Sequence, residues 1–337
     1  MNTGSKISLF TLLITMGLIT GIFSLMLGRY HISSQELTQF IVSIFNTGAP
    51  ETSPVKTVLI DIRLPRVLAA FMVGGTLSIT GATYQGMFRN PMVSPSILGV
   101  SAGAGFGATL AIIFGLNAFM QQSLSFLFGV VAVVVVYMIN LVSGKRYDKC
   151  LTLILAGMIV AAVFSALLSM LKYTADPDNA LPSIVYWLMG GLSEIETSQL
   201  RFISSFSIPG LLLLSISGWK LDMLSFGDEE AKTMGIRVER FRFFVIIIAT
   251  LMTASAVSIS GIIGWVGLLV PHIARMIFGP KNAVLLPASF LIGGIFLLIV
   301  DDFSRSISSM EIPLGITTSL IGAPFFIYIL MKTGKKQ

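Results

Sequence analysis

The sequence predicts an all-α polytopic membrane protein with about ten transmembrane helices and an inverted repeat. Apolar residues make up 54% of the 337-residue chain and charged residues 11%, whereas soluble domains carry about 25% charged residues. The mean hydropathy is +0.88. Apolar runs near the length of about 20 residues that a bilayer requires recur along the whole chain. These observations exclude a soluble globular domain.

Ten segments are candidate spans. The first is too long for the apolar core of a secretory signal, so we expect it to be retained. The eighth is short and contains Pro271, which leaves its ends undefined. In order, the spans cover residues 7–28, 66–85, 93–115, 123–143, 151–171, 199–219, 241–260, 262–279, 284–302 and 313–331.

Two connections between spans are long enough to hold structure of their own. Residues 29–65 contain an amphipathic piece over 33–45. Residues 172–198 contain a short helix over 182–191, whose Tyr186 and Trp187 suit a membrane–water interface. Both connections lie on the outer side in the topology derived below.

An even number of spans puts both termini on one side of the membrane. If that side is the cytoplasm, the inner segments hold 15 basic residues and the outer segments hold seven. This asymmetry follows the positive-inside rule. The basic residues are therefore sorted by membrane side, so the net charge of +6 does not indicate a nucleic-acid partner.

A faint internal repeat occurs at a spacing of 180 residues. Leu77–Gly81 resembles Val257–Gly261, and Pro91 and Gly99 are matched by Pro271 and Gly279. The copies begin at spans two and seven, so spans 2–5 and 7–10 would run in opposite directions. Inverted repeats are typical of transporters.

The segment 220–242 is the most charged part of the chain, with ten charged residues in 23 positions. It predicts a short helix, because Gly227 precedes three acids and Gly235 follows them. The alternative is a solvated loop that only joins two spans. The residues that favour a functional helix are Gly227, Asp228, Glu229, Glu230, Ala231 and Gly235.

The sequence contains no recognisable catalytic centre. No phosphate-binding loop is present, so the chain is not an enzyme and any ATP hydrolysis belongs to a separate subunit. Cys150 is the one cysteine, which excludes an intrachain disulfide, and we expect no metal site and no cofactor. Asp301 and Asp302 are expected at the outer end of span nine, within reach of solvent.

Motifs in a fixed order identify a family resemblance. The chain resembles the iron-siderophore and vitamin B12 family of ABC importer permeases, from about Arg63 to Lys332. Overall it looks most like the branch of metal-chelate permeases that includes molybdate and tungstate importers. The motifs are Arg63-Leu64-Pro65-Arg66, Gly81-x-x-x-Gln85-Gly86, Asn90-Pro91, Pro95–Val100, Leu155-Ala156-Gly157, Tyr186–Gly191, Gly267–His272, Pro313-Leu314-Gly315 and Gly322-Ala323-Pro324.

The resemblance implies one permease domain over residues 1–337 in a bacterial inner membrane. It implies a homodimer that works with two ATP-binding subunits and a periplasmic substrate-binding protein. The segment 220–242 would then be the cytoplasmic loop that couples the permease to the ATPase.

The resemblance also assigns roles at the outer face. Arg63, Arg66 and Arg305 correspond to arginines that meet acidic residues of the binding protein. Exposed arginine forks suit carboxylate partners. The alternative is that Arg63 and Arg66 pair with Asp61 or anchor the span.

At the inner face the resemblance places a gate in the turn 147–152. The gate and path candidates are Lys149, Cys150, Leu151, Ala156 and Gly157. The alternative for the small residues of span five is close helix packing.

The expected function is passage of a metal oxyanion, such as molybdate or tungstate, or of a metal chelate. The alternative cargoes are ferric siderophores, haem and cobalamin. A different class of protein, an ion-coupled secondary transporter, also fits the sequence pattern.

Overall fold

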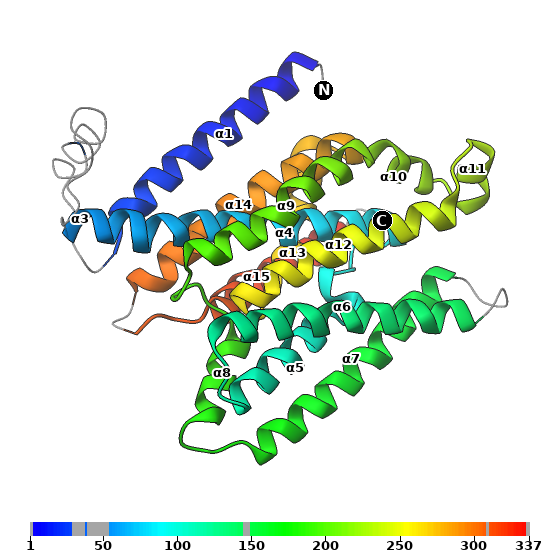
Figure 1. Ribbon diagram of the computed structural model, residues 1–337. Coiled ribbons are helices and arrows are strands. Elements are labelled where there is room, and N and C mark those ends of the chain that lie inside the picture. The colour runs from blue at the N-terminus through cyan, green and yellow to red at the C-terminus, as the bar shows by residue number, and fades with distance from the viewer. Residues whose placement is uncertain (1–2, 29–37, 39–53, 144–148, 308–309, 335–337) are drawn as a thin grey trace.

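The computed structural model describes residues 3–28, 38, 54–143, 149–307 and 310–334, and they form helices and connections (Figure 1). The expected amphipathic piece at 33–45 lies almost wholly outside the described residues. The elements are α1 (Thr3–Met26), α3 (Pro54–Lys56), the π-helix η1 (Thr57–Arg63), α4 (Leu64–Phe88), the 3-10 helix η2 (Pro95–Leu98), α5 (Val100–Ile113), α6 (Ala118–Val142), α7 (Lys149–Thr174), α8 (Ala180–Met189), α9 (Thr197–Ile216), α10 (Gly218–Leu224), α11 (Asp228–Thr233), α12 (Val238–Ser260), α13 (Val266–Phe278), α14 (Asn282–Ser306) and α15 (Leu314–Gly334).

A helix covers each of the ten predicted spans: α1, α4, α5, α6, α7, α9, α12, α13, α14 and α15. Within the described part, α1, α6, α7, α9, α12 and α14 are long and apolar enough to cross a bilayer by length and composition. The predicted eighth span begins later than expected. Residues 261–265 leave the helix, and Trp265 has a φ of 68°, so α13 starts at Val266.

The short helices mark the two ends of the bundle. In Figure 1, α10 and α11 lie at one end, and α3 and α8 lie at the other. We call these the α11 end and the α8 end. The predicted short helix near 182–191 is confirmed as α8, and the predicted short helix in the charged segment is confirmed as α11.

Helix α4 forms the centre of the bundle, and its small residues allow close neighbours. A Cβ on Gly74 would lie 2.2 Å from the Gly293 carbonyl oxygen of α14, and one on Gly81 would lie 1.8 Å from the Gly267 carbonyl oxygen of α13. Small residues at such contacts are the usual means of bringing membrane helices together. The hydroxyls of Thr76 and Ser207 also join α4 to α9, at 2.6 Å.

The two predicted halves match in their succession of helices. The helices α4, α5, α6 and α7 have 25, 14, 25 and 26 residues, and α12, α13, α14 and α15 have 23, 13, 25 and 21. In Figure 1, α4 starts at the α8 end and α12 starts at the α11 end, so the two run in opposite directions.

The 180-residue spacing that suggested the repeat is nevertheless wrong as a structural register. Three of the corresponding pairs begin at 64 and 238, 100 and 266, and 118 and 282, which are offsets of 174, 166 and 164 residues. Gly81 lies inside α4, where it permits a close contact, whereas Gly261 follows α12 with a φ of 65°. The two glycines are thus required for different physical reasons.

The contact between α4 and α13 gives a first prediction. Gly81→Ala forces a methyl group against the Gly267 backbone, and overpacking of this kind costs about 1–3 kcal/mol. We expect a lower Tm in detergent. Gly264→Ala is the matched control, because a Cβ there has no neighbouring atom within 4 Å. Equal Tm values for the two variants would contradict the close approach.

Candidate functional site

At the α11 end, α10 is held firmly against the start of α14. Asp222 accepts hydrogen bonds from the backbone N and the side-chain Nδ2 of Asn282, both at 2.8 Å. A Cβ on Gly218 would lie 2.6 Å from the Ala283 nitrogen, and Leu221 and Leu224 are buried. Helix α10 is therefore part of the packed structure.

Helix α11 has one anchored side. Asp228 accepts two hydrogen bonds from Arg242 of α12, at 2.7 and 2.6 Å, and Arg89 lies 3.9 Å away. Ala231 is fully buried. Gly227 and Gly235, which flank the helix, have φ of 132° and 84°, values that favour glycine.

The other side of α11 faces outward. Phe226, Glu229, Glu230 and Met234 are exposed. Lys232 donates a hydrogen bond to Glu229 at 2.6 Å, which raises the pKa of the lysine. The apolar residues of the segment do not share one side, because Leu224 and Ile236 are buried whereas Met234 is exposed. The segment is thus a preformed projection with a fixed base, and a loose loop is excluded.

At the α8 end, three helices meet in a cluster of charges that we call the arginine–aspartate cluster: Arg63, Arg66, Asp301, Asp302, Arg305 and Glu311. Arg66 donates to both oxygens of Asp301, at 3.0 Å from Nε and 2.9 Å from Nη2, and to Glu311 at 3.0 Å. Arg305 bonds the Ser24 carbonyl at 2.6 Å and pairs with Asp302. Arg63 bonds the Leu25 carbonyl at 2.7 Å.

The expectation that these groups are exposed is wrong. The exposed fractions are 4% for Arg63, 7% for Arg305 and 0% for Asp301, and Asp302 is also buried. The reason is that α1 and α14 end here and α4 begins here, so the carboxylates and guanidinium groups satisfy one another. Burial, and then the nearby Arg305, lower the pKa of Arg63. Arg66 pairs with Asp301. Pairing of Arg66 with Asp61, the alternative considered from the sequence, is not what the structure shows.

The start of α7 holds the predicted gate residues. Lys149 pairs with Glu239 of α12. Cys150 is only 8% exposed and packs into the core, whereas Leu151 is 54% exposed. Positions 147 and 148 of the predicted turn lie outside the described residues. Lys149, Cys150 and Leu151 are the gate candidates within this turn. Among them, Leu151 is the one with an apolar side chain that faces out of the subunit.

The two small residues proposed for the path face inward. Ala156 and Gly157 are buried, and a Cβ on Gly157 would lie 2.3 Å from the Ile97 carbonyl oxygen of η2. Close helix packing, the alternative considered from the sequence, therefore describes this pair. Further along α7, a different set of small residues is exposed: Ala162, Ser165, Ala166 and Ser169.

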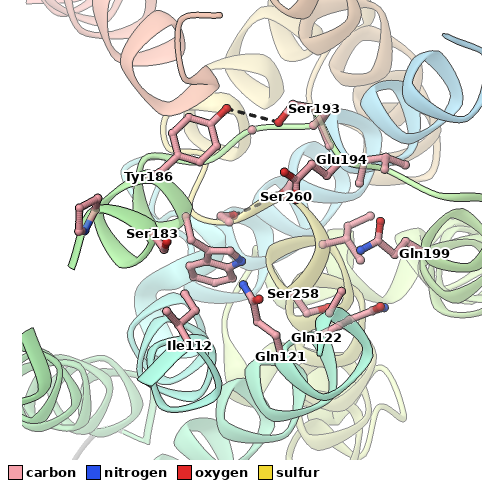
Figure 2. Close-up of a pocket in the computed structure, with 18 residues that line it drawn as sticks. Ile112, Gln121, Gln122, Ser183, Tyr186, Ser193, Glu194, Gln199, Ser258 and Ser260 are labelled. Carbon is pink, nitrogen blue, oxygen red and sulfur yellow. Dashed lines mark hydrogen bonds between the residues drawn. The ribbon is translucent and has the colours of Figure 1, made fainter. Parts of the chain in front are cut away.

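A pocket of about 550 Å³ opens at the α8 end (Figure 2). Its walls come from the ends of α5 and α12, the starts of α6 and α9, helix α8 and the following connection. In Figure 2 the polar ends of Gln121 and Gln199 lie at the cavity, and the hydroxyls of Tyr186 and Ser193, 3.3 Å apart, join across one edge. The polar lining consists of Gln121, Gln122, Ser183, Tyr186, Trp187, Ser193, Glu194, Gln199, Ser258 and Ser260.

The break after α12 fixes one wall of this pocket. Ser260 accepts a hydrogen bond from the Gly191 nitrogen at 2.9 Å through its carbonyl oxygen, and a Cβ on Gly261 would lie 2.2 Å from the Trp187 carbonyl oxygen. Irregular backbone at a helix break in a membrane protein is tolerated where it is buried or lines a cavity. The lining offers mainly neutral amide and hydroxyl groups, with Glu194 as its acid.

Sequence reasoning missed this pocket. Gln121 and Gln122 at the start of an otherwise apolar span, and Ser258 and Ser260 near the end of another, were visible signals. Their convergence was not visible, because it depends on how α6 and α12 pack.

Comparison with known proteins decides the family. The FecCD transport family matches residues 14–332. The chain belongs to the FecCD transport family. It is a permease of the ABC importer class, and this assignment excludes the ion-coupled secondary transporter considered from the sequence.

This FecCD permease has relatives along almost its whole length. The molybdate import system permease protein MolB of Haemophilus influenzae is 41% identical over 95% of each chain. An iron chelatin transport system permease protein of Helicobacter pylori is 35% identical over 94% of this chain and 95% of the relative. A metal-chelate-type ABC transporter solved in an inward-facing conformation superposes with a TM-score of 0.86 at 38% identity, covering 96% of this chain and 99% of that one.

The arginine–aspartate cluster gives a second prediction. Asp301→Asn removes the buried partner of Arg66, and breaking a buried ion pair costs about 3–5 kcal/mol. We expect a large fall in Tm in detergent. Glu229→Gln is the control, since it breaks the exposed pair with Lys232, and exposed pairs contribute about 0–1 kcal/mol. A fall of the same size in both variants would refute a structural role for the cluster.

Proposed function

We propose that this permease forms a homodimer that works with two ATP-binding subunits and a periplasmic substrate-binding protein to import a metal oxyanion or a metal chelate. Residues 1–337 form one permease domain. The observation that carries the proposal is the anchored α11 projection in an ABC permease that has no phosphate-binding loop of its own. Such a chain requires a surface that receives movement from a separate ATPase.

The ATPase contact consists of the exposed side of α11 within the segment 220–242. Phe226 and Met234 supply apolar surface, and Glu229 and Glu230 supply charge. Gly227, Asp228, Ala231 and Gly235 act differently. They shape α11 or hold it to α12 and so supply the rigid base through which force passes.

The α11 end lies in the cytoplasm of a bacterial cell, and both termini lie on the same side. The excess of basic residues in the segments at this end supports the orientation. The α8 end then faces the periplasm, where its pocket is open to substrate.

Docking of the binding protein involves the rim of the arginine–aspartate cluster. Arg63 and Arg305 are buried, so they act by holding α1 and α14 in place. Arg66 is different, because it bonds Glu311, whose side chain is 31% exposed. A carboxylate of the binding protein reaches Arg66 by replacing Glu311.

The proposed path runs between two copies of the chain, next to α7. The exposed small residues of α7 leave room beside the axis of a dimer, and Leu151 with Lys149 stands at its cytoplasmic mouth. Cys150, Ala156 and Gly157 support that wall from inside the subunit.

Metal oxyanions are the preferred cargo. The relative named for molybdate import and the neighbour described as metal-chelate-type support an oxyanion or chelate. The neutral donors of the α8-end pocket suit brief contact with a hydrated oxyanion, since they would not trap it by charge. Ferric siderophores, haem and cobalamin remain the alternative class, and the relative named for iron chelatin favours the first of these.

The function is tested in proteoliposomes with ATPase subunits and ATP inside and the binding protein outside. We expect ATP-dependent uptake of molybdate or tungstate, and lower uptake of a ferric chelate and of cobalamin. Glu229→Lys with Glu230→Lys should lower ATP-dependent uptake and ATPase retention at least about tenfold, a change of about 1.4 kcal/mol.

The matched control reverses the exposed acid Asp178 at the α8 end, as Asp178→Lys, and should keep ATPase retention unchanged. Normal ATPase retention and uptake in the double variant would exclude α11 as the coupling surface. Preferential uptake of cobalamin or a ferric chelate would reject the oxyanion.

The dimer is tested by cysteine cross-linking at the start of α7. In a Cys150→Ala background, Leu151→Cys places a thiol on the outward side, and mild oxidation should link two copies. The parent chain should not be linked through Cys150, because that thiol is buried. Leu153→Cys, also buried, is the control. Linking through Cys150 or Leu153→Cys but not through Leu151→Cys would place another surface at the dimer axis.

A further inference from the structure

An apolar groove runs along the outside of the bundle between α6 and α12. Its volume is about 360 Å³. Val134 and Met138 of α6 and Ile247 of α12 line it and are exposed. The rings of Tyr137 and Phe243 pack 4.9 Å apart within it. Apart from Tyr137 and Thr250, every lining side chain is a hydrocarbon or thioether.

The groove continues into a polar pocket of about 140 Å³ toward the α11 end. The two cavities share Tyr137, Leu141 and Ile246. The pocket adds Asn140 from the last turn of α6, Lys149 from α7, and Glu239 and Arg242 from α12. A long apolar channel therefore ends at a small polar site.

Two polar atoms in the pocket residues lack partners in the protein. Asn140 is 9% exposed and its Oδ1 has no hydrogen bond, and Arg242 is 6% exposed and its Nε also has none. Buried polar groups are almost always hydrogen-bonded. Both atoms have almost no accessible surface, so they lie just beneath the pocket wall and leave its polar groups incompletely satisfied.

The charges around the pocket favour an anion. Lys149 is balanced by Glu239, but Arg242 and Arg89 share the one carboxylate of Asp228, which leaves a positive excess. In addition, α12 begins at Val238, so its N-terminus lies at this level. Helix N-termini attract anions. The end of α6, with its opposite dipole, offsets part of this effect.

The length of the groove matches half a bilayer. Its α6 lining runs from Val130 to Leu141, about 16 Å at 1.5 Å per residue, and half of the hydrocarbon core is about 15 Å. The polar pocket therefore lies at the depth of lipid phosphates when the groove lies beside acyl chains.

We propose that this site binds one phospholipid with an anionic, hydroxyl-bearing headgroup, of the phosphatidylglycerol type. An acyl chain occupies the groove, and the phosphate lies near Lys149 and the guanidinium group of Arg242. A glycerol hydroxyl of the headgroup lies next to the Asn140 side chain. Because Arg242 also holds Asp228, the lipid would stiffen the base of α11.

The site is tested by native mass spectrometry of the full-length permease, in the assembly in which it purifies, after delipidation. The probes are dioleoyl phosphatidylglycerol, dioleoyl phosphatidylcholine and inorganic phosphate. We expect phosphatidylglycerol to bind about tenfold more tightly than phosphatidylcholine, because both lipids carry the phosphate but only phosphatidylglycerol has headgroup hydroxyls for Asn140 and no choline cation. Inorganic phosphate alone should not be retained.

Variants separate the headgroup from the chain. Asn140→Leu should weaken phosphatidylglycerol binding several-fold and leave phosphatidylcholine unchanged. Lys149→Gln should weaken phosphatidylglycerol more than phosphatidylcholine, because the choline cation already offsets the phosphate charge of the latter. Lys281→Gln, an exposed lysine at the same end, is the control. Val134→Trp fills the groove and should weaken both lipids, and Ile14→Trp on α1 is its control. Met138→Trp replaces Val134→Trp if the latter lowers Tm.

Three outcomes would overturn the proposal. The first is equal binding of the two lipids by the parent chain. The second is retention of inorganic phosphate with the same response to Lys149→Gln, which would assign a simple anion pocket. The third is a Val134→Trp variant that loses dimers but keeps lipid, which would assign the groove to a contact between copies.

Discussion

The close approach of α4 to α13 and α14 is the contact on which the rest of the structure depends. In hydrocarbon, lipid is as apolar as leucine, so helices associate by close packing and not by expulsion of water. Gly74, Gly81 and Gly293 remove the side chains that would keep the backbones apart. The helices that surround α4 take their positions from this centre. The cluster and the pocket at the α8 end, and the base of α11 at the other, are built from its neighbours.

The buried charges follow from the same arrangement. Bringing α1, α4 and α14 together at the α8 end removes Arg66, Arg305 and Asp301 from water, and an unpaired charge there would be very unfavourable. Each guanidinium group is therefore bonded to carboxylates or carbonyl oxygens of the chain. The cluster therefore joins α1, α4 and α14, and its most accessible part is the pair of Arg66 and Glu311.

Sequence alone predicted the features that depend on local pattern. Hydropathy located ten spans, and glycines with acids between them located α11. Features that depend on packing were not predicted correctly. The sequence could not show that Asp301 bonds Arg66, 235 positions away. It could not show that Cys150 is buried while Leu151 is exposed. Nor could it show that glutamines of α6 and serines of α12 line one pocket. The repeat was expected for the wrong residues, because Gly81 and Gly261 recur for unrelated reasons.

Helix α12 connects the features at the two ends. It begins next to α11, where Arg242 holds Asp228, and it ends at Ser260 in the wall of the α8-end pocket. Its 23 residues span about 35 Å without an internal proline or glycine. Gly261 and the non-helical residues after it end α12 before α13 begins, and the Ser260 carbonyl is held there by the Gly191 nitrogen at 2.9 Å. A continuous helix that is bonded to α11 at one end and to the connection after α8 at the other is suited to carry a displacement of α11 to the pocket. The apolar groove between α6 and α12 lies along this same helix.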